Sequence, residues 1–464
     1  MTQYDLAVIG GGSAGYAAAA TAARIGLTTI CIDGGTEVGG LCILRGCMPS
    51  KTILESANRF ITLRRADEFG LSAGQIGFDA GAIRKRKRKL IAEFAGYRQS
   101  QLENGKFEFV RARASFISPN RLHLAKLEGG EQEIGFRTAV IATGSELNQL
   151  EIPGLADVPF LHSDLALDSG SVPRSVTILG GGAIALEFTH FYNALGSKVT
   201  VIQRSPQFLK EADTEVAGAL IEALRGRGVQ MISGTKLIKV ASEDGEKAVY
   251  FLQDGAQKRI ATDELFYALG RKAATRGLNL EAAGVELTSS GAVQVNERMQ
   301  STQPHVFAAG DVAGLHEVVH IAIEQAVVAV KNAQRLLQGE ELGKMDYRLR
   351  LFAVFTQPQL AFVGLTEREA QEQNIPIRSA SYPFADHGKS LVRGEPEGFV
   401  KLIAHDQTRE ILGGAVVGPE GAELIHEIVV AMYFRASASQ LATVPHYHPT
   451  LSEIWTYPAE ELAS

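Results

Sequence analysis

The sequence predicts an α/β fold, because a buried strand followed by a glycine-rich turn and a helix occurs twice in its 464 residues. The first copy starts at Tyr4 and the second at Ser175, roughly 170 residues later, which indicates an internal duplication. Beyond Leu351, alternating strands and helices are typical of an α+β domain. A chain of this length exceeds a single hydrophobic core, so several domains are expected.

In the first copy, the strand from Tyr4 to Ile9 runs into the turn Gly10-Gly11-Gly12-Ser13-Ala14-Gly15. This G-x-G-x-x-G pattern is typical of a Rossmann-like unit, in which glycines let a pyrophosphate approach a helix N-terminus. The next strand contains Cys31, which is expected to be a packing residue, and ends at Asp33. An acid at that offset can bind ribose hydroxyls, so the sequence predicts a dinucleotide site here.

The second copy has the turn Gly180-Gly181-Gly182-Ala183-Ile184-Ala185, but its next strand ends at Gln203-Arg204 instead of an acid. An acid there would repel a 2′-phosphate, whereas Arg204 and Lys210 would bind one through charge-assisted hydrogen bonds. This unit therefore predicts NADPH in preference to NADH. The alternative is that Arg204 and Lys210 are ordinary surface cations.

Between the copies, the segment from Gly39 to Lys51 holds the cysteines Cys42 and Cys47. If the segment starts a helix, their spacing brings the sulfurs within disulfide reach, and a nearby lysine lowers a thiol pKa. The alternative is a pair of buried structural cysteines. A zinc site is less favoured, because no second Cys or His pair lies nearby.

Composition excludes several function classes. The net charge of −6 gives no sign of nucleic acid or an anionic membrane as partner, and 45% hydrophobic residues suit a globular protein. No apolar run is long enough for a membrane span, and the N-terminus does not resemble a signal peptide. Three cysteines argue against a secreted disulfide scaffold, so we expect a cytoplasmic protein. The basic run Arg84 to Lys89 is expected to lie on a solvated helix, and docking of an acidic partner is the alternative.

Together these motifs resemble the class I flavin-dependent pyridine nucleotide–disulfide oxidoreductases, the family of glutathione reductase, dihydrolipoamide dehydrogenase and mercuric reductase. The resemblance covers essentially the whole chain. It rests on Gly39 to Lys51, the two glycine turns with Glu187, Gly270-Arg271, Ala309-Gly310-Asp311, Phe355 to Pro358, and His448 to Glu453. It implies an FAD-binding domain (1–147), an NAD(P)-binding domain (148–271), a central domain (272–342) and a C-terminal α+β dimerisation domain (343–464).

The resemblance also implies the cofactor-binding residues. FAD would be bound by Gly10, Gly12, Gly15, Asp33, Gly40, Ala114, Gly144 and Asp311. NADPH, with NADH as a second choice, would be bound by Gly180, Gly182, Arg204, Lys210, Gly270 and Arg271. Lys51 and Glu187 match an ion pair beside the flavin N5, and no resident metal is implied.

The same resemblance implies four catalytic residues. Cys47 matches the charge-transfer cysteine beside the flavin, and Cys42 matches the interchange cysteine that faces the substrate. His448 matches the acid/base residue and Glu453 its orienting partner. In this family the histidine comes from the partner subunit, so a homodimer is implied.

The leading hypothesis is an NADPH-dependent reductase of a small disulfide. The alternative is a dihydrolipoamide dehydrogenase that oxidises dihydrolipoyl groups with NAD⁺ and docks to a larger complex. The tail from His446 to Glu453 is closer to that group, whereas Gln203 departs from it. Ala183 departs from glutathione reductases, and Leu44 and Arg45 between the cysteines depart from the common family pattern.

Overall fold

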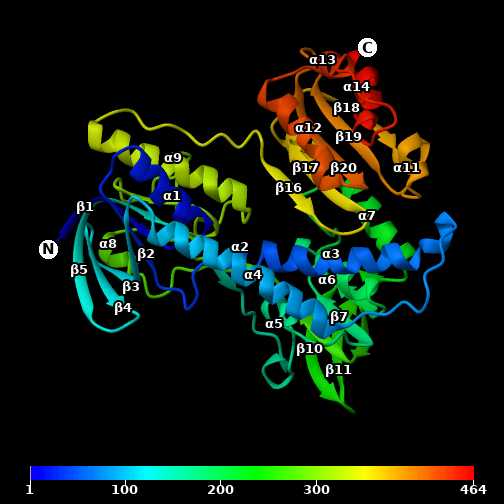
Figure 1. The fold of residues 1–464 in the computed structure, drawn as a ribbon, viewed down its shortest axis with the longest axis horizontal. Helices are drawn as coiled ribbons and strands as arrows, with labels where there is room; N and C mark the ends of the chain where they lie inside the picture. Colours follow the sequence, from blue (N-terminus) through cyan, green and yellow to red (C-terminus); the bar gives the residue numbers. More distant parts are fainter. Residues whose placement is uncertain (1) are drawn as a thin grey trace. The chain divides into compact units, whose positions relative to one another are not determined.

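The computed structural model describes residues 2–464, which form two compact units (Figure 1). The first unit combines the chain up to Pro49 with Lys85–Gln149 and Gly270–Asp346. The second unit combines Ser50–Arg84, Leu150–Leu269 and Tyr347–Ser464. The four domain boundaries expected from the sequence remain a prediction.

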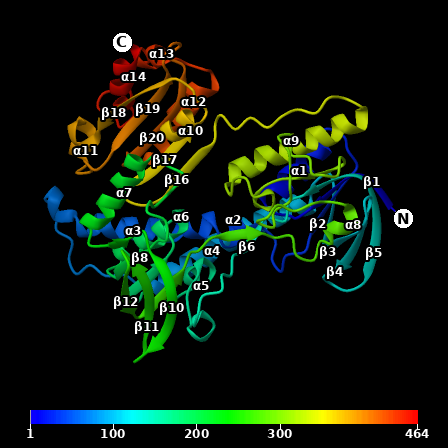
Figure 2. The ribbon, with the colours of Figure 1, turned by 180° about the vertical axis from the view of Figure 1, so that it is seen from behind.

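The first unit is built on a six-stranded sheet in which β1 lies between β2 and β5 and is parallel to both. Its strands are β1 (Thr2–Ile9), β2 (Thr29–Asp33), β3 (Glu108–Ser118), β4 (Arg121–Lys126), β5 (Glu131–Ile141) and β15 (Val306–Ala308). A short pair, β6 (Ser145–Leu147) and β14 (Arg271–Ala273), and helix α8 (Leu280–Ala283) complete it. Helices α1 (Ser13–Arg24) and α9 (Val319–Gln338) lie side by side (Figures 1 and 2), because α1 buries mostly alanine and glycine.

The second unit repeats this arrangement with a four-stranded parallel sheet in the order β13-β7-β8-β9. Its strands are β7 (Ser175–Leu179), β8 (Lys198–Ile202), β9 (Gln230–Ile232) and β13 (Glu264–Tyr267), with helices α5 (Ser163–Leu167), α6 (Ala183–Ala194) and α7 (Thr214–Gly226). An antiparallel meander of β10 (Lys236–Glu243), β11 (Glu246–Gln253) and β12 (Ala256–Thr262) follows. The predicted duplication of a Rossmann-like unit is thus confirmed.

The C-terminal part of the second unit is the predicted α+β domain. An antiparallel sheet in the order β16-β17-β20-β19-β18 is made of β16 (Leu351–Val354), β17 (Gln359–Gly364), β18 (Ile377–Pro383), β19 (Phe399–His405) and β20 (Ile411–Gly418). Its helices are α10 (Glu367–Glu372), α11 (Gly388–Val392), α12 (Gly421–Tyr433), α13 (Ala438–Ala442) and α14 (Thr456–Ala463). Trp455 is fully buried in the core between sheet and helices, and its indole N–H donates to Leu424 O at 3.1 Å.

The two cysteines do not share one helix start, so the condition under which their spacing alone brings the sulfurs within disulfide reach is not met. Cys42 lies on α2 (Gly40–Leu44), and Cys47 is the first residue of a separate helix, α3 (Cys47–Arg64). The chain turns back at Gly46, where a Cβ would lie 3.1 Å from the Cα of Cys42. The two residues between the helices therefore form a turn, and α3 starts close to α2.

The basic run lies on α4 (Ala80–Glu103), as expected. Most of its cations are exposed or half-buried, but Lys87 is buried. Among the described residues, no helix has the length and apolar character needed to cross a membrane.

Candidate active site

The first glycine turn forms a cradle that side chains would fill. Gly10 has φ +117°, and a Cβ there would lie 2.3 Å from Ala142 O. A Cβ on Gly15 would lie 1.8 Å from Gly10 O, and one on Gly40 would lie 2.5 Å from the Cα of Gly12. The turn therefore keeps backbone N–H groups open at the N-terminus of α1, which fits the pyrophosphate of a dinucleotide.

Asp33 stands at the C-terminal end of β2, next to this turn. Its carboxylate lies 3.0 Å from the position of a Cβ on Gly11, and its Oδ1 accepts the N–H of Gly35 at 3.0 Å. Arg111 donates to the backbone carbonyls of Asp33 and Gly35, which holds the chain after β2 in place. This is the geometry expected of a ribose-binding carboxylate.

A second polar group of the first unit gathers at Asp311, directly after β15. Ser145 Oγ donates to Asp311 Oδ2 at 2.6 Å, and Arg271 donates from Nε to Ser145 Oγ and from Nη2 to Ser145 O, both at 2.8 Å. Burial raises the pKa of Glu317, the charge of Asp311 raises it further, and Arg271 opposes the change. Arg271, which the resemblance assigns to NADPH, is therefore bonded in the same unit as the residues assigned to FAD.

Three other assigned positions also belong to the first unit. Gly144 follows β5 with φ +74°, and Gly270 precedes β14 with φ +96°. Ala114 lies on β3 opposite Leu124 of β4. Both glycines adopt left-handed backbone conformations that other residues rarely reach.

The second glycine turn has the same geometry as the first. Gly180 has φ +118°, and a Cβ there would lie 2.2 Å from Ala268 O. A Cβ on Gly181 would lie 3.0 Å from Cδ of Gln203, so this side chain faces the turn as Asp33 faces Gly11. Gly182, whose Cβ would meet nothing within 4 Å, precedes α6. The chain therefore has two cradles with different side chains beside them.

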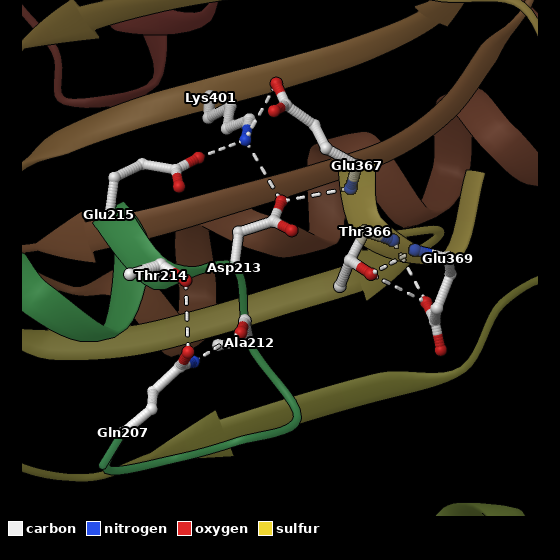
Figure 3. Close-up of polar contacts among 9 residues, drawn as sticks. All are labelled: Gln207, Ala212, Asp213, Thr214, Glu215, Thr366, Glu367, Glu369 and Lys401. Carbon is white, nitrogen blue, oxygen red and sulfur yellow. Dashed lines mark hydrogen bonds and ion pairs between the residues drawn. The ribbon is translucent and has the colours of Figure 1, made fainter. Parts of the chain in front are cut away.

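Arg204 and Lys210 are exposed on the loop between β8 and α7. Figure 3 shows how this loop is held: Gln207 donates to Ala212 O at 2.9 Å and accepts from Thr214 Oγ1 at 3.0 Å. Arg368 donates to Lys210 O at 2.7 Å. The backbone of this loop is therefore tethered, while the side chains of Arg204 and Lys210 stay exposed.

A buried lysine secures the end of the same loop (Figure 3). Lys401 of β19 is 3% exposed, and its ammonium lies 3.0 Å from both Asp213 and Glu367, with Glu215 as a third partner. Burial disfavours the charge, but bonds to these carboxylates outweigh it and raise the pKa of Lys401. This network connects the start of α7 to the sheet of the C-terminal domain.

Lys51 and Glu187 are in direct contact within the second unit. The ammonium lies 2.8 and 2.9 Å from the two oxygens of the buried carboxylate. Glu187 also accepts the N–H of Phe355 at 3.2 Å, and Lys51 lies 4.5 Å from the Phe355 ring centroid. A bidentate pair with these further contacts holds the ammonium in a fixed position.

The three cysteines have different surroundings. Cys42 and Cys47 are half-buried, whereas Cys31 is buried and burial raises the pKa of its thiol, with the charge of Asp33 adding to the effect. Cys31 is therefore a packing residue, as expected, because a protonated buried thiol is unreactive. Arg45, between the other two cysteines, donates to Glu37 at 3.0 Å.

The C-terminal motif holds an arrangement that the sequence did not reveal. Nδ1 of the exposed His448 lies 2.9 Å from Oε2 of Glu453, and the other oxygen lies 3.3 Å from Nε2 of buried His387. His387 Nδ1 lies 2.9 Å from Ser390 Oγ. Burial lowers the pKa of His387, and Glu453 opposes this change. His387 is thus a second partner of the orienting carboxylate, whereas His446 binds Glu427 instead.

The features described so far are two glycine cradles that fit a dinucleotide, two half-buried cysteines and a histidine–carboxylate pair. The chain belongs to the pyridine nucleotide-disulphide oxidoreductase family, because residues 4–333 match the sequence pattern of that family. Residues 352–459 match the dimerisation domain of the same family. The resemblance inferred from the sequence is therefore confirmed, as is the presence of a C-terminal dimerisation domain.

Curated relatives cover nearly the same length. A dihydrolipoyl dehydrogenase of Thermus scotoductus is 35% identical over 100% of this chain and 98% of its own. A protein of the same name from Mycobacterium tuberculosis is 33% identical over 98% and 97%.

Two solved structures share the fold. The HOCl-induced flavoprotein disulfide reductase RclA of Escherichia coli matches with a TM-score of 0.85 and 27% identity, over 98% of this chain and 99% of its own. LpdA of Mycobacterium tuberculosis matches over both whole chains with a TM-score of 0.89 and 26% identity. This chain is accordingly a flavoprotein oxidoreductase that uses FAD and a pyridine nucleotide.

Proposed function

We propose that this enzyme uses NADPH to reduce a small disulfide, with Cys42 and Cys47 as its redox-active pair. The observation that carries the cofactor choice is Gln203, a neutral side chain beside the second glycine turn where an acid would repel a 2′-phosphate. Arg204 and Lys210 on the same tethered loop would supply the cations.

Each cofactor is assigned to one of the two glycine cradles and to residues of the same unit. Gly10, Gly12, Gly15, Asp33, Gly40, Ala114, Gly144 and Asp311 would hold FAD, and Gly180, Gly182, Arg204 and Lys210 would hold NADPH. Gly270 and Arg271 stay proposed nucleotide contacts, although the bonds of Arg271 to Ser145 favour the FAD side. Lys51 and Glu187 are proposed to act on the flavin ring. When bound, FAD would supply the chemistry that passes two electrons from the nicotinamide to the Cys42–Cys47 disulfide.

The thiol chemistry then uses residues of this chain. The Cys42 thiolate attacks one sulfur of the substrate disulfide, which forms a mixed disulfide and releases the first thiol. Cys47 attacks Cys42 Sγ, which releases the second thiol and restores the disulfide. His448, whose Nδ1 lies 2.9 Å from Glu453, would give a proton from Nε2 to the leaving thiolate. The dimerisation domain supports a homodimer in which His448 serves the cysteine pair of the partner subunit.

A second candidate is dihydrolipoamide dehydrogenase activity, favoured by the names of the relatives and by the C-terminal motif. In that case the same thiol steps would proceed in reverse, with NAD⁺ as the electron acceptor. The enzyme would then also dock to a larger complex. A cytoplasmic location remains a prediction under both candidates.

Nucleotide consumption by the purified FAD-loaded protein separates these candidates. We expect NADPH to be oxidised faster than NADH in the presence of a small disulfide, with lipoamide and oxidised glutathione tested in parallel. Turnover of lipoamide alone, together with a preference for NADH, would favour the dehydrogenase. Flavin reduction by NADPH without turnover of either disulfide would support the relay and direct the search to other disulfides.

A further inference from the structure

Helix α4 presents two unsatisfied polar side chains one turn apart. Nε and Nη1 of Arg98 and Oε1 of Gln101 are buried, and within residues 2–464 they have no hydrogen-bond partner. Residues three apart on a helix share one face, so Arg98 and Gln101 lie on the same side of α4. Leaving such atoms buried and unpaired costs free energy, most of all for a cation, so the arrangement indicates a missing ligand.

The Arg98 guanidinium is held over an aromatic ring. Its central carbon lies 4.2 Å from the centroid of Tyr16, which belongs to the first turn of α1. Stacking occupies one face of the guanidinium and leaves its in-plane N–H groups available. A planar fork fixed in this way suits a carboxylate, which accepts two parallel hydrogen bonds.

The helix that carries Cys42, α2, starts at Gly40, where a Cβ would lie 2.5 Å from the Cα of Gly12, four residues before Tyr16. The guanidinium that stacks on Tyr16 therefore belongs to the same region as Cys42, and its electrostatics agree. Burial lowers the pKa of Arg98, and the negative charges that Tyr16, Cys42 and Tyr97 can carry oppose this change. Arg45, which stands between the two cysteines in the sequence, is already paired with Glu37. Arg98, in contrast, has buried donors without a partner within residues 2–464 and feels the charge of the cysteine proposed to attack the substrate.

We propose that Arg98 binds a carboxylate of the substrate disulfide, while Gln101 Oε1 accepts an N–H from the same molecule. The substrate class would be small disulfides of amino-acid or peptide type, in which a carboxylate and an N–H group lie near the sulfurs. This inference rests on the proposed function, because it assigns the substrate that Cys42 attacks.

Three probe disulfides isolate the carboxylate, because they share an S–CH₂–CH₂ skeleton and differ in the end group. Dithiodipropionate carries carboxylates, bis(hydroxyethyl) disulfide carries hydroxyls, and cystamine carries ammonium groups. The wild-type holoenzyme should have the highest kcat/KM for dithiodipropionate. Arg98→Met should lower that value about 10- to 100-fold, the usual range for a charge-assisted hydrogen bond, and change the hydroxyl probe little. Arg98→Lys should restore part of the loss.

The matched control is Arg45→Met, which removes the paired cation between the cysteines and should leave the order of the probes unchanged. If the wild type reduces all three probes equally, the inference is overturned and the proposed function stands. If it reduces none, the inference is overturned, and the proposed function fails with it only if NADPH also leaves the flavin oxidised. Loss of bound FAD in Arg98→Met, read from the flavin absorbance, would mean that Arg98 serves the cofactor and would also overturn the inference.

Discussion

The side chain of Gln203 lies against Gly181, where a Cβ on the glycine would come within 3.0 Å of the amide carbon. Asp33 has the same relation to Gly11 in the first unit, again at 3.0 Å. The duplicated fold thus brings a neutral amide and a carboxylate to equivalent positions. Because both units bring a side chain to this position, we propose that Gln203 influences the choice of nucleotide in the second unit.

Gln203→Glu should shift the enzyme from NADPH towards NADH. The new carboxylate would repel a 2′-phosphate and accept hydrogen bonds from ribose hydroxyls, so the ratio of kcat/KM values should move towards NADH by about tenfold or more. Steady-state kinetics with both nucleotides measure this ratio. Gln257→Glu, on an exposed part of β12, adds the same charge elsewhere and should leave it unchanged. An unaltered ratio in Gln203→Glu would remove this residue from cofactor selection.

Cys42→Ser should abolish disulfide turnover and leave flavin reduction by NADPH intact. A serine hydroxyl cannot attack a disulfide at neutral pH, so turnover should fall by about a thousandfold or more. Stopped-flow absorbance follows flavin reduction, and NADPH consumption follows turnover. Cys31→Ala is the control, because Cys31 is buried and its thiol stays protonated. Substantial turnover in Cys42→Ser would reject the dithiol mechanism.

His387 is expected to act through Glu453 as a positioning residue. In His387→Ala the Glu453 carboxylate loses the imidazole that lies 3.3 Å from one of its oxygens, so it can turn away from His448. We expect about tenfold lower kcat with little change in KM, because the proton of His448 is then poorly aimed at the leaving thiolate. His387→Gln keeps a polar side chain near the position of Nε2 and should restore most of kcat. A loss of stability without any change in kcat would assign His387 a purely structural role.

The parts of the site that the sequence predicts are those that depend on local geometry. Gly10 and Gly180 have positive φ, as their glycine motifs predict. Asp33 ends β2 and Gln203 directly follows β8, where the sequence also predicts them. Whether one helix would hold both cysteines was left open by the sequence, because the close approach of Gly46 to Cys42 is a contact that no periodicity records. His387 lies 66 residues before Glu453 (453 − 387), and Arg98 reaches Tyr16 from another helix, so only the folded chain reveals either pairing.

Lys401→Met should destabilise the second unit. The change leaves the buried carboxylate of Asp213 without its cation, which typically costs about 3 to 5 kcal/mol. The midpoint of thermal unfolding should fall clearly, and NADPH affinity should weaken because Asp213 ends the loop of Arg204 and Lys210. Lys198→Met, at an exposed position of β8, is the control and should change little. A midpoint equal to that of the wild type would show that the network adds no net stability.

Because His190 is buried, we expect acid to lower the unfolding free energy of the second unit. The side chain is buried on α6 with Nε2 2.7 Å from Asn58 Oδ1, and burial, aided by the charge of Arg227, lowers its pKa from 6.5 to about 3. Between these values the unfolded chain binds a proton that the folded chain does not. The contribution of His190 is therefore complete above pH 6.5 and is lost as the pH falls towards 3, by about 1.4 kcal/mol per pH unit.

His190→Gln keeps an amide donor for Asn58 and cannot titrate, so its unfolding free energy should fall less steeply with acid than that of the wild type. Urea unfolding of both proteins at several values between pH 7 and about pH 4 measures the difference in slope. His426→Gln removes an exposed histidine of α12 and should retain the wild-type slope. Because other groups titrate equally in all three proteins, only the difference between slopes reports on His190. Identical slopes for His190→Gln and the wild type would mean that the folded chain accepts the proton at this site.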